Sequence, residues 1–461
     1  MSTITAPTYD PTATAQALAQ KYTATAQSAL TTDTAAATAT AKALAGLGAA
    51  ITSFQSSLGT LTGTGKTILS QTATLSDTAY GSASASGKAV AGTYDFFVSQ
   101  VATAGQAKYS NLTDTTGASG MLRVKIGSGT AGFDVDLGKA AGDGSLTVRE
   151  LAAAINNASG NAGKVSASVV TFGTNTQLVL SSTQTGEASA VALDTTNVNA
   201  GTLKTALGTA ANVSTTTPQD AIVWVGGKSG TEVKQASNTF TNVDGLSVSV
   251  TKAHADGDAN LTVTVKTDNS GTAANVKSFV DAYNALKKTL DGMVASANTD
   301  TGAAAGAFAA DAGVLALQAR LVTVLRPAGG GSTLASFGIA AQRDGTLALD
   351  TTRLNKQLAI QPDGLDRLLG STSTSAASGI AGALDTYLDQ WSGINGQIKQ
   401  RTDANTKQQS GLTKRQTDLD SKYNAAYDRY LKQFTDLQTL QSTMNSNVSL
   451  FDALFSSDKS S

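Results

Sequence analysis

The sequence predicts a multidomain α+β protein in which terminal helices form coiled-coil legs and a helical domain, with two nested β-rich domains inserted between them. Near the N-terminus, apolar residues recur in alternating steps of three and four, as on one face of a helix. Over residues 380–455 they recur in heptads, whereas the middle of the chain alternates apolar and polar residues, as strands do. A chain of 461 residues exceeds one core and predicts about three or four domains.

The C-terminal heptads are the longest pattern in the chain. Leu384, Trp391, Ile398, Leu412 and Leu419 follow one line that is broken at residue 405. Because the seam is polar between Arg401 and Arg415, we expect two helical segments rather than one rod. Beyond Leu419 the register slips by one residue, and two lines continue as Tyr423, Tyr430, Leu437, Met444 and Phe451, and as Tyr427, Phe434, Gln441 and Val448.

A narrow apolar seam needs a partner surface, and the N-terminal region offers one. From residue 41 its helical pattern is strong, and Leu18, Tyr22, Ala26 and Leu30 continue it faintly upstream. Two interpretations remain open: the core of an ordinary helical bundle, or legs that assemble with other chains. For the second, the expected assembly seam comprises Leu44, Leu47, Ile51, Phe54, Tyr423, Tyr427, Tyr430, Phe434, Leu437, Met444, Val448 and Phe451.

The middle of the chain contains two hairpin patterns and one capped helix. Leu122–Ile126 and residues 133–137 alternate around a glycine-rich turn, with Arg123 and Lys125 expected opposite Asp134 and Asp136. Residues 147–150 form a capping box that predicts a helix over about 147–157. Residues 246–250 and 261–265 predict a second hairpin.

These patterns lead out through sheets and back to helices, which predicts nested domains. We expect an N-terminal leg segment at 1–40, a helical body at 41–75 and 272–400, an inner β-domain at 76–115 and 218–271, an outer α+β insert at 116–217, and a C-terminal coiled-coil leg at 401–461.

The composition argues against several functional classes. The net charge is -1 and 15% of residues are charged, so nothing in the composition favours binding to nucleic acid or an anionic membrane, both of which need a concentrated basic face. The chain has no Cys, and no apolar run reaches the ~18 residues that a membrane span needs. Residues 1–20 contain no Lys or Arg and no apolar core, so we do not expect a cleavable signal there.

No cluster of residues suggests catalysis. The one histidine, His254, falls in the polar turn 253–260, and we expect it to be solvated rather than a base or a metal ligand. Residues 63–67 (Gly-Thr-Gly-Lys-Thr) imitate a phosphate-binding loop, but Thr60 replaces its first glycine and a helix precedes it instead of a strand. We therefore expect no catalytic, cofactor or metal site, and no enzyme.

Several separated motifs resemble one known family in order and spacing. They are residues 91–102 (AGTYDFFVSQVA), 219–227 (QDAIVWVGG), 279–284 (FVDAYN), 337–339 with 344–347, and 433–437 (QFTDL). Together they resemble the flagellar filament cap family, also called hook-associated protein 2, along nearly the whole chain.

The resemblance implies a structural protein that caps the distal tip of the bacterial flagellar filament, promotes folding and insertion of exported flagellin, and prevents its loss. It implies a secreted, extracellular homo-oligomeric ring of five or six subunits. The implied partners are flagellin, the hook–filament junction protein, a flagellar export chaperone, and mucin or a host surface, without nucleic acid or membrane insertion. The alternatives are a secreted adhesin that binds mucin or host glycans through its β-domains, or another axial protein, either flagellin or the hook–filament junction protein.

Overall fold

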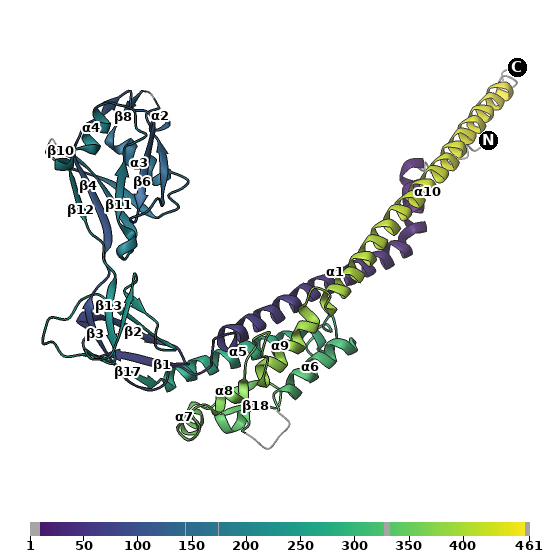
Figure 1. Cartoon of the computed structure of the whole chain (residues 1–461). Helices are drawn as coiled ribbons and strands as arrows, with labels where there is room; N and C mark the ends of the chain where they lie inside the picture. The colour runs from purple at the N-terminus through teal and green to yellow at the C-terminus, as the bar shows by residue number, and fades with distance from the viewer. Residues whose placement is uncertain (1–9, 143, 174, 327–331, 457–461) are drawn as a thin grey trace. The chain divides into compact units, whose positions relative to one another are not determined.

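The computed structural model describes residues 10–142, 144–173, 175–326 and 332–456 (Figure 1). Contacts divide the chain into two compact units. Unit 1 comes from both ends, residues 1–65 and 276–461, and unit 2 comprises residues 66–275. The structure is therefore a multidomain α+β fold in which a β-rich unit is inserted into a helical one.

Helices dominate unit 1. Asp10 caps the first of them by accepting a hydrogen bond from the backbone N–H of Thr12, and a proline at the first position suits the start of a helix. The helices are α1 (Pro11–Thr62), α5 (Asn269–Val294), which enters the unit at Val276, α6 (Ala312–Val324), α7 (Thr351–Ile360), α8 (Gly364–Leu369), α9 (Gly379–Ser392) and α10 (Gln397–Ser456). They are joined by the 3₁₀ turn η4 (Leu334–Phe337) and the small hairpin β18 (Ile339–Ala341) and β19 (Leu347–Leu349).

Helix α1 is continuous, and its buried face differs from the faint upstream pattern. Tyr22 is 61% exposed and Ala26 is also exposed. The buried residues instead recur every seven positions as Thr23, Leu30, Ala37, Leu44, Ile51 and Leu58. Small Thr and Ala side chains occupy two of these positions, so residue size, rather than apolar character, allows close helix packing there.

The C-terminal region is two helices, as predicted, but the break is elsewhere. It lies at residues 393–396, between α9 and α10, and contains Gly393 and Gly396. The polar stretch from Arg401 to Arg415 lies within the continuous helix α10. The prediction failed because polar side chains in a helical seam can be satisfied by the neighbouring helix, whereas two closely spaced glycines weaken the helix itself.

An aromatic cluster occupies the core of unit 1. The ring of Phe54 in α1 lies 6.5 Å from that of Phe279 and 6.3 Å from that of Tyr283, both in α5. Burial, and next the Asp291 carboxylate, raise the pKa of Tyr283 to about 12. These contacts tie α1 into the helical body.

Unit 2 contains two core clusters, each with its own sheets. One cluster lies between a five-stranded sheet in the order β1-β17-β3-β13-β14 and a three-stranded sheet in the order β15-β16-β2. Residues 71–75, which we expected in the helical body, form β1 and pair with β17. The strands are β1 (Gln71–Leu75), β2 (Gly81–Ala85), β3 (Gly92–Gln100), β13 (Ala221–Val225), β14 (Thr231–Gln235), β15 (Thr239–Phe240), β16 (Leu246–Val250) and β17 (Leu261–Thr267), with the 3₁₀ turn η1 (Thr78–Tyr80).

The second cluster spans residues 107–207 and belongs to the outer part of unit 2. A sheet in the order β12-β4-β10-β9 and a sheet in the order β11-β6-β7 enclose it together with α3, whose predicted capping box between Thr147 and Glu150 is confirmed. The elements are β4 (Ala104–Leu112), β5 (Thr115–Thr116), β6 (Met121–Ile126), β7 (Gly132–Asp136), α2 (Leu137–Ala140), β8 (Ser145–Leu146), α3 (Val148–Asn157), β9 (Val165–Phe172), β10 (Asn175–Thr185), η2 (Glu187–Ser189), β11 (Val191–Asp194), α4 (Thr202–Gly208), η3 (Ala210–Asn212) and β12 (Val213–Thr216).

Strand β4 corrects the predicted boundary between the two β-domains. We expected residues 76–115 in the inner domain, but β4 pairs with β10 and β12 of the outer sheet. The two cores support a nested division, which we propose as an inner domain at 66–102 and 218–275 and an outer domain at 103–217.

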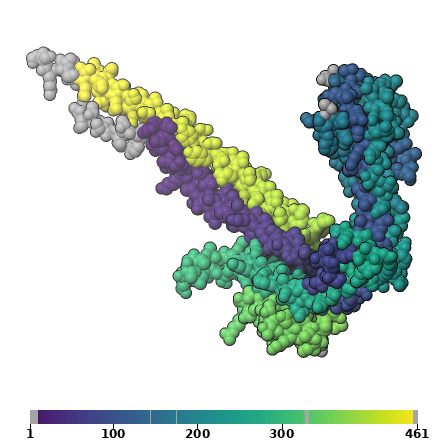
Figure 2. All heavy atoms as spheres, turned by 90° about the vertical axis from the view of Figure 1, so that its left-hand side faces the viewer, coloured from purple at the N-terminus to yellow at the C-terminus, as the bar shows by residue number. Residues whose placement is uncertain are grey.

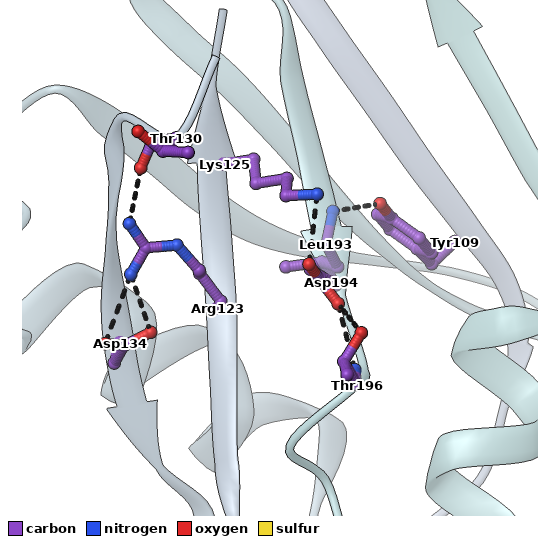
Figure 3. Close-up of polar contacts among 8 residues, drawn as sticks. All are labelled: Tyr109, Arg123, Lys125, Thr130, Asp134, Leu193, Asp194 and Thr196. Carbon is purple, nitrogen blue, oxygen red and sulfur yellow. Dashed lines mark hydrogen bonds and ion pairs between the residues drawn. The ribbon is translucent and has the colours of Figure 1, made fainter. Parts of the chain in front are cut away.

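The β6–β7 hairpin forms as predicted, with one change in its ion pairs (Figure 3). Arg123 of β6 forms an ion pair with Asp134 of β7 at 3.1 Å. Lys125 of β6 forms one with Asp194 of β11, the strand on the other side of β6, at 3.0 Å. Thr196, through its hydroxyl and backbone N–H, and next Lys125, hold the pKa of Asp194 well below its usual value. Asp136 instead caps α2.

Candidate assembly surface

Helices α1 and α10 pair antiparallel as a coiled coil, and both figures show them side by side (Figures 1 and 2). The direction follows from cross-helix contacts: Ala37 meets Asn405, whereas Gln27 meets Gln416 farther along α10. Leu30 and Ala37 of α1 form a buried cluster with Leu412 and Leu419 of α10. The chain therefore supplies its own partner for this part of the heptad seam.

Polar residues in this seam make specific contacts. Asn405 is 6% exposed, and its side-chain amide donates to the carbonyl of Ala37 at 3.0 Å. Gln409 also reaches this carbonyl, at 3.4 Å. By contrast, Gln408 and Arg415 are exposed. The polar interruption of the seam therefore consists of Asn405 and Gln409.

The base of α10 is fixed to the helical body by Arg401. Its guanidinium makes two hydrogen bonds with Asp311, the capping residue of α6, and lies 5.2 Å from the ring centre of Trp391. Although burial acts to raise it, the ion pair with Arg401 and the N–H of Val314 hold the pKa of Asp311 below its usual value. Arg401 therefore stabilises the base of α10, where we expected the seam to be weak.

Farther along α10, the aromatic residues of the predicted seam are half-buried. The rings of Tyr423 and Tyr427 are stacked with their centres 6.5 Å apart, and the Arg429 guanidinium lies 4.8 Å from the ring centre of Tyr430. Phe434 and Val448 are also half-buried. These residues are only partly covered within the described chain, which leaves apolar surface on this part of α10.

The last turns of α10 display large apolar side chains to solvent. Residues 437–451 contain no charged side chain, whereas Lys432 and Asp436 just before them form an ion pair. The apolar stripe of α10, as we name this surface, comprises Leu437 (49% exposed), Leu440 (57%), Met444 (50%), Leu450 (65%), Phe451 (57%) and Leu454 (60%). Adjacent exposed apolar residues on a largely uncharged stretch of helix are typical of an interaction surface.

The structure thus separates the predicted assembly seam into two groups. Leu44, Leu47, Ile51 and Phe54 are at most 2% exposed and belong to the bundle core of unit 1. The residues on α10 remain candidates for assembly. Sequence reasoning missed Leu440, Leu450 and Leu454. The step of three from Leu437 to Leu440 was a visible signal, but Asn447 interrupts the heptad line from Leu440 to Leu454.

His254 is not the solvated turn residue that we expected. It is 9% exposed, and its ring stacks between Tyr80 at 4.2 Å and Phe97 at 4.7 Å. Its Nδ1 accepts a hydrogen bond from the backbone N–H of Val98 at 3.0 Å. The stack fastens the loop after β16 to β3, which is a packing role. The surrounding sequence concealed it because the aromatic partners are distant in the chain.

No constellation for chemistry was found in the described part of the chain. Across residues 10–142, 144–173, 175–326 and 332–456, no group of three or more His, Cys, Asp or Glu side chains is arranged to hold a metal ion. Within the same ranges, none of the helices combines the length and the apolar character that crossing a bilayer requires.

A chain with paired terminal helices, an inserted β-rich unit and an apolar stripe on its C-terminal helix has the organisation of a structural, self-assembling subunit. Comparison with known proteins specifies which kind. Residues 8–105 match the model of the flagellar hook-associated protein 2 N-terminus, and residues 218–446 match that of its C-terminus. The chain belongs to the flagellar hook-associated protein 2 family, the filament cap proteins.

Relatives and solved structures agree with this assignment. The lateral flagellar hook-associated protein 2 of Vibrio parahaemolyticus is 32% identical over 384 residues, covering 82% of this chain and 84% of the relative. The B-type protein of Pseudomonas aeruginosa is 29% identical over 420 residues, covering 86% and 85%. The fold resembles the crystal structure of the flagellar cap protein FliD D1-D2-D3 domains from Escherichia coli, with a TM-score of 0.58 and 24% identity, covering 79% of this chain and 99% of that one.

Proposed function

We propose that this chain forms a homo-oligomeric cap at the distal, extracellular tip of a bacterial flagellar filament. There it retains exported flagellin and promotes its folding and insertion. Family membership supports the capping role. The observation that carries the mechanism is the apolar stripe of α10, because an exposed, uncharged heptad stripe fits the helices of a neighbouring axial subunit.

In this mechanism the legs are docking elements. The part of α10 from Tyr423 onward carries half-buried tyrosines and exposed leucines, whereas its first turns are fixed through the ion pair of Arg401 with Asp311. A closed ring cannot make identical contacts with every subunit of a helical filament, because rotational closure and helical rise are different symmetries. Some legs are therefore loosely docked at any moment, which opens a space under the cap for an incoming flagellin and allows the cap to advance.

The test is complementation of a strain that lacks its cap gene. Without the cap, cells should secrete flagellin monomers and carry hooks without filaments, and the wild-type chain should restore filaments. Replacing Leu440 and Met444 with Lys should abolish this rescue while the protein is still exported, since two charges would be buried in the docked helix.

A matched control places two lysines elsewhere on the same turns. Gln438 and Ser442 are exposed and four residues apart, as Leu440 and Met444 are, and the helical period puts them on a different side of α10 from the apolar stripe. This control should restore filaments as the wild type does. Filaments of normal length in the Leu440 and Met444 variant would show that the stripe has no docking role, and filaments in the strain without any cap would refute the proposed function itself.

A further inference from the structure

The outer sheet ends in a strand whose free edge is sealed over only half its length. At the start of β9, the Asn161 side chain accepts from the N–H of Val165 and donates to its carbonyl, at 2.9 and 2.8 Å. Asn156 makes the same pair of bonds with Ala167, both at 2.8 Å. Each amide thus replaces one residue of a neighbouring strand and blocks the edge there.

The second half of this edge is open. Successive residues of a strand direct their backbone N–H and C=O groups to opposite edges. The backbone groups of Val169 and Thr171 therefore face the same free edge as those of Val165 and Ala167. Among the described residues, none hydrogen bonds to the backbone of Val169 or Thr171. The adjoining Phe172 is 66% exposed.

This edge also lacks the usual protection against pairing. Residues 165–186, which include all of β9 and β10, contain no Asp, Glu, Lys or Arg. Charged side chains are one of the means by which soluble proteins keep an edge strand from pairing with another chain. In the same unit, the edge strand β14 carries such charges in Glu232 and Lys234.

The opposite edge of the same sheet has matching properties. Strand β12 pairs with β4, whose Lys108 and Gln106 lie opposite Ser214 and Thr216. Because β4 uses its alternate residues for β10, the outward backbone groups of β12 belong to Val213 and Thr215. This strand is likewise uncharged.

We propose that β9 of one copy of this chain pairs with β12 of the next copy, so that the outer sheets join across the subunit boundary. The second copy is the fitting occupant because one sheet supplies both complementary edges, and each is uncharged. Such a contact uses two different surfaces, so it is head-to-tail, the type of contact that forms a ring when the rotation between copies closes. The inference rests on the proposed oligomeric cap and assigns one of its lateral contacts.

The first test is Thr171→Pro in the full chain. Proline at this position removes only the outward N–H and leaves the bonds to β10 in place, but it blocks pairing with a new strand. Sedimentation velocity should show the oligomer dissociating at concentrations at least about tenfold higher than for the wild type, as expected for losing an interchain bond and adding a clash. Thr171→Val keeps the N–H and should assemble normally.

The second test does not depend on tolerance of proline. Since the chain has no Cys, Thr171→Cys and Thr215→Cys introduced together are the only thiols. A short bismaleimide should link this double variant into covalent dimers and larger oligomers, whereas each single variant should stay monomeric on a denaturing gel. Linked dimers of the single Thr171→Cys variant would indicate symmetric pairing of β9 with β9 and overturn the proposal.

The outcomes separate this inference from the proposed function. An unchanged oligomer for Thr171→Pro, or the absence of covalent links in the double variant while oligomers persist, would refute the β9–β12 contact and leave the cap intact. A wild-type chain that stays monomeric at all concentrations would refute the ring as well.

Discussion

Replacing Asn405 with Leu should stabilise the paired terminal helices. Asn405 is buried against α1 and contributes one hydrogen bond to the Ala37 carbonyl. Leucine would extend the cluster formed by Leu30, Leu412 and Leu419. A polar residue at such a seam position costs stability while restricting which helices can pair.

The magnitude follows from two opposing effects. The lost hydrogen bond contributes about 1 kcal/mol net. Full burial of a leucine side chain contributes about 1.5–3 kcal/mol. The carbonyl of Ala37 remains within 3.4 Å of the Gln409 amide, so it keeps a side-chain partner. The difference predicts stabilisation by about 0.5–2 kcal/mol, or roughly two- to thirtyfold slower amide exchange in this region.

Hydrogen exchange followed by mass spectrometry measures this directly on peptides from α1 and α10. Gln408→Leu is the matched control, because Gln408 lies three residues farther along α10 but is exposed, so the free energy of exchange should stay within about 0.5 kcal/mol of the wild-type value. If leg docking must remain reversible, Asn405→Leu should still cap filaments but elongate them more slowly.

Two results would refute this reasoning. Exchange in Asn405→Leu that is equal to or faster than in Gln408→Leu would show that Asn405 does not limit the stability of the seam. Filament growth at or above the wild-type rate, despite demonstrably slower exchange, would remove the argument that weak legs are needed for the cap to advance.

Three further predictions concern other contacts. Phe54→Ala should lower the free energy of unfolding of the helical unit by about 3–5 kcal/mol in urea titrations, since it empties an aromatic core position, whereas Tyr22→Ala, at an exposed position, should change it by less than about 1 kcal/mol. Asp311→Ala should cost about 1–2 kcal/mol in the same titration and speed exchange in the first turn of α6, because the cap and the Arg401 partner are both lost. Asp194→Asn should lower the Tm at neutral pH, and the difference should shrink below about pH 4, because a carboxyl with a depressed pKa stabilises the fold when ionised and loses this effect as it is protonated.

Each of these has an outcome that contradicts it. A Phe54→Ala change no larger than that of Tyr22→Ala would place the aromatic contact outside the core. Unchanged exchange at the start of α6 in Asp311→Ala would deny the capping role. A Tm difference for Asp194→Asn that grows as the pH falls would reverse the assigned sign.

Periodicity predicted several elements whose contacts are local or regular. It was wrong about the second hairpin, because the two strands join different sheets: β16 pairs with β2 and β15, whereas β17 pairs with β1 and β3. The β6–β7 hairpin, the capping box at Thr147 and the two C-terminal helices could be read from residue patterns, because side-chain spacing reports directly on a strand or helix face. The burial of His254 could not, since stacking with Tyr80 and Phe97 depends on segments far apart in the chain.

The candidate site was predictable in part for the same reason. Heptads identified Leu437 and Met444 on α10, but they cannot distinguish a seam covered by the same chain from one left for a partner. Leu44 and Leu437 occupy similar positions in their patterns, yet one is 1% and the other 49% exposed. Only the position of the facing helix decides between these outcomes.

The contacts at the base of α10 determine how precisely its far end is positioned. Sixty residues of helix form an arm of about 90 Å, so each degree of tilt at the base moves the tip by roughly 1.6 Å. The bidentate contact of Arg401 with Asp311 and its position against Trp391 restrict that tilt at the pivot. A substitution of Arg401, Asp311 or Trp391 would therefore displace the apolar stripe without changing any of its side chains.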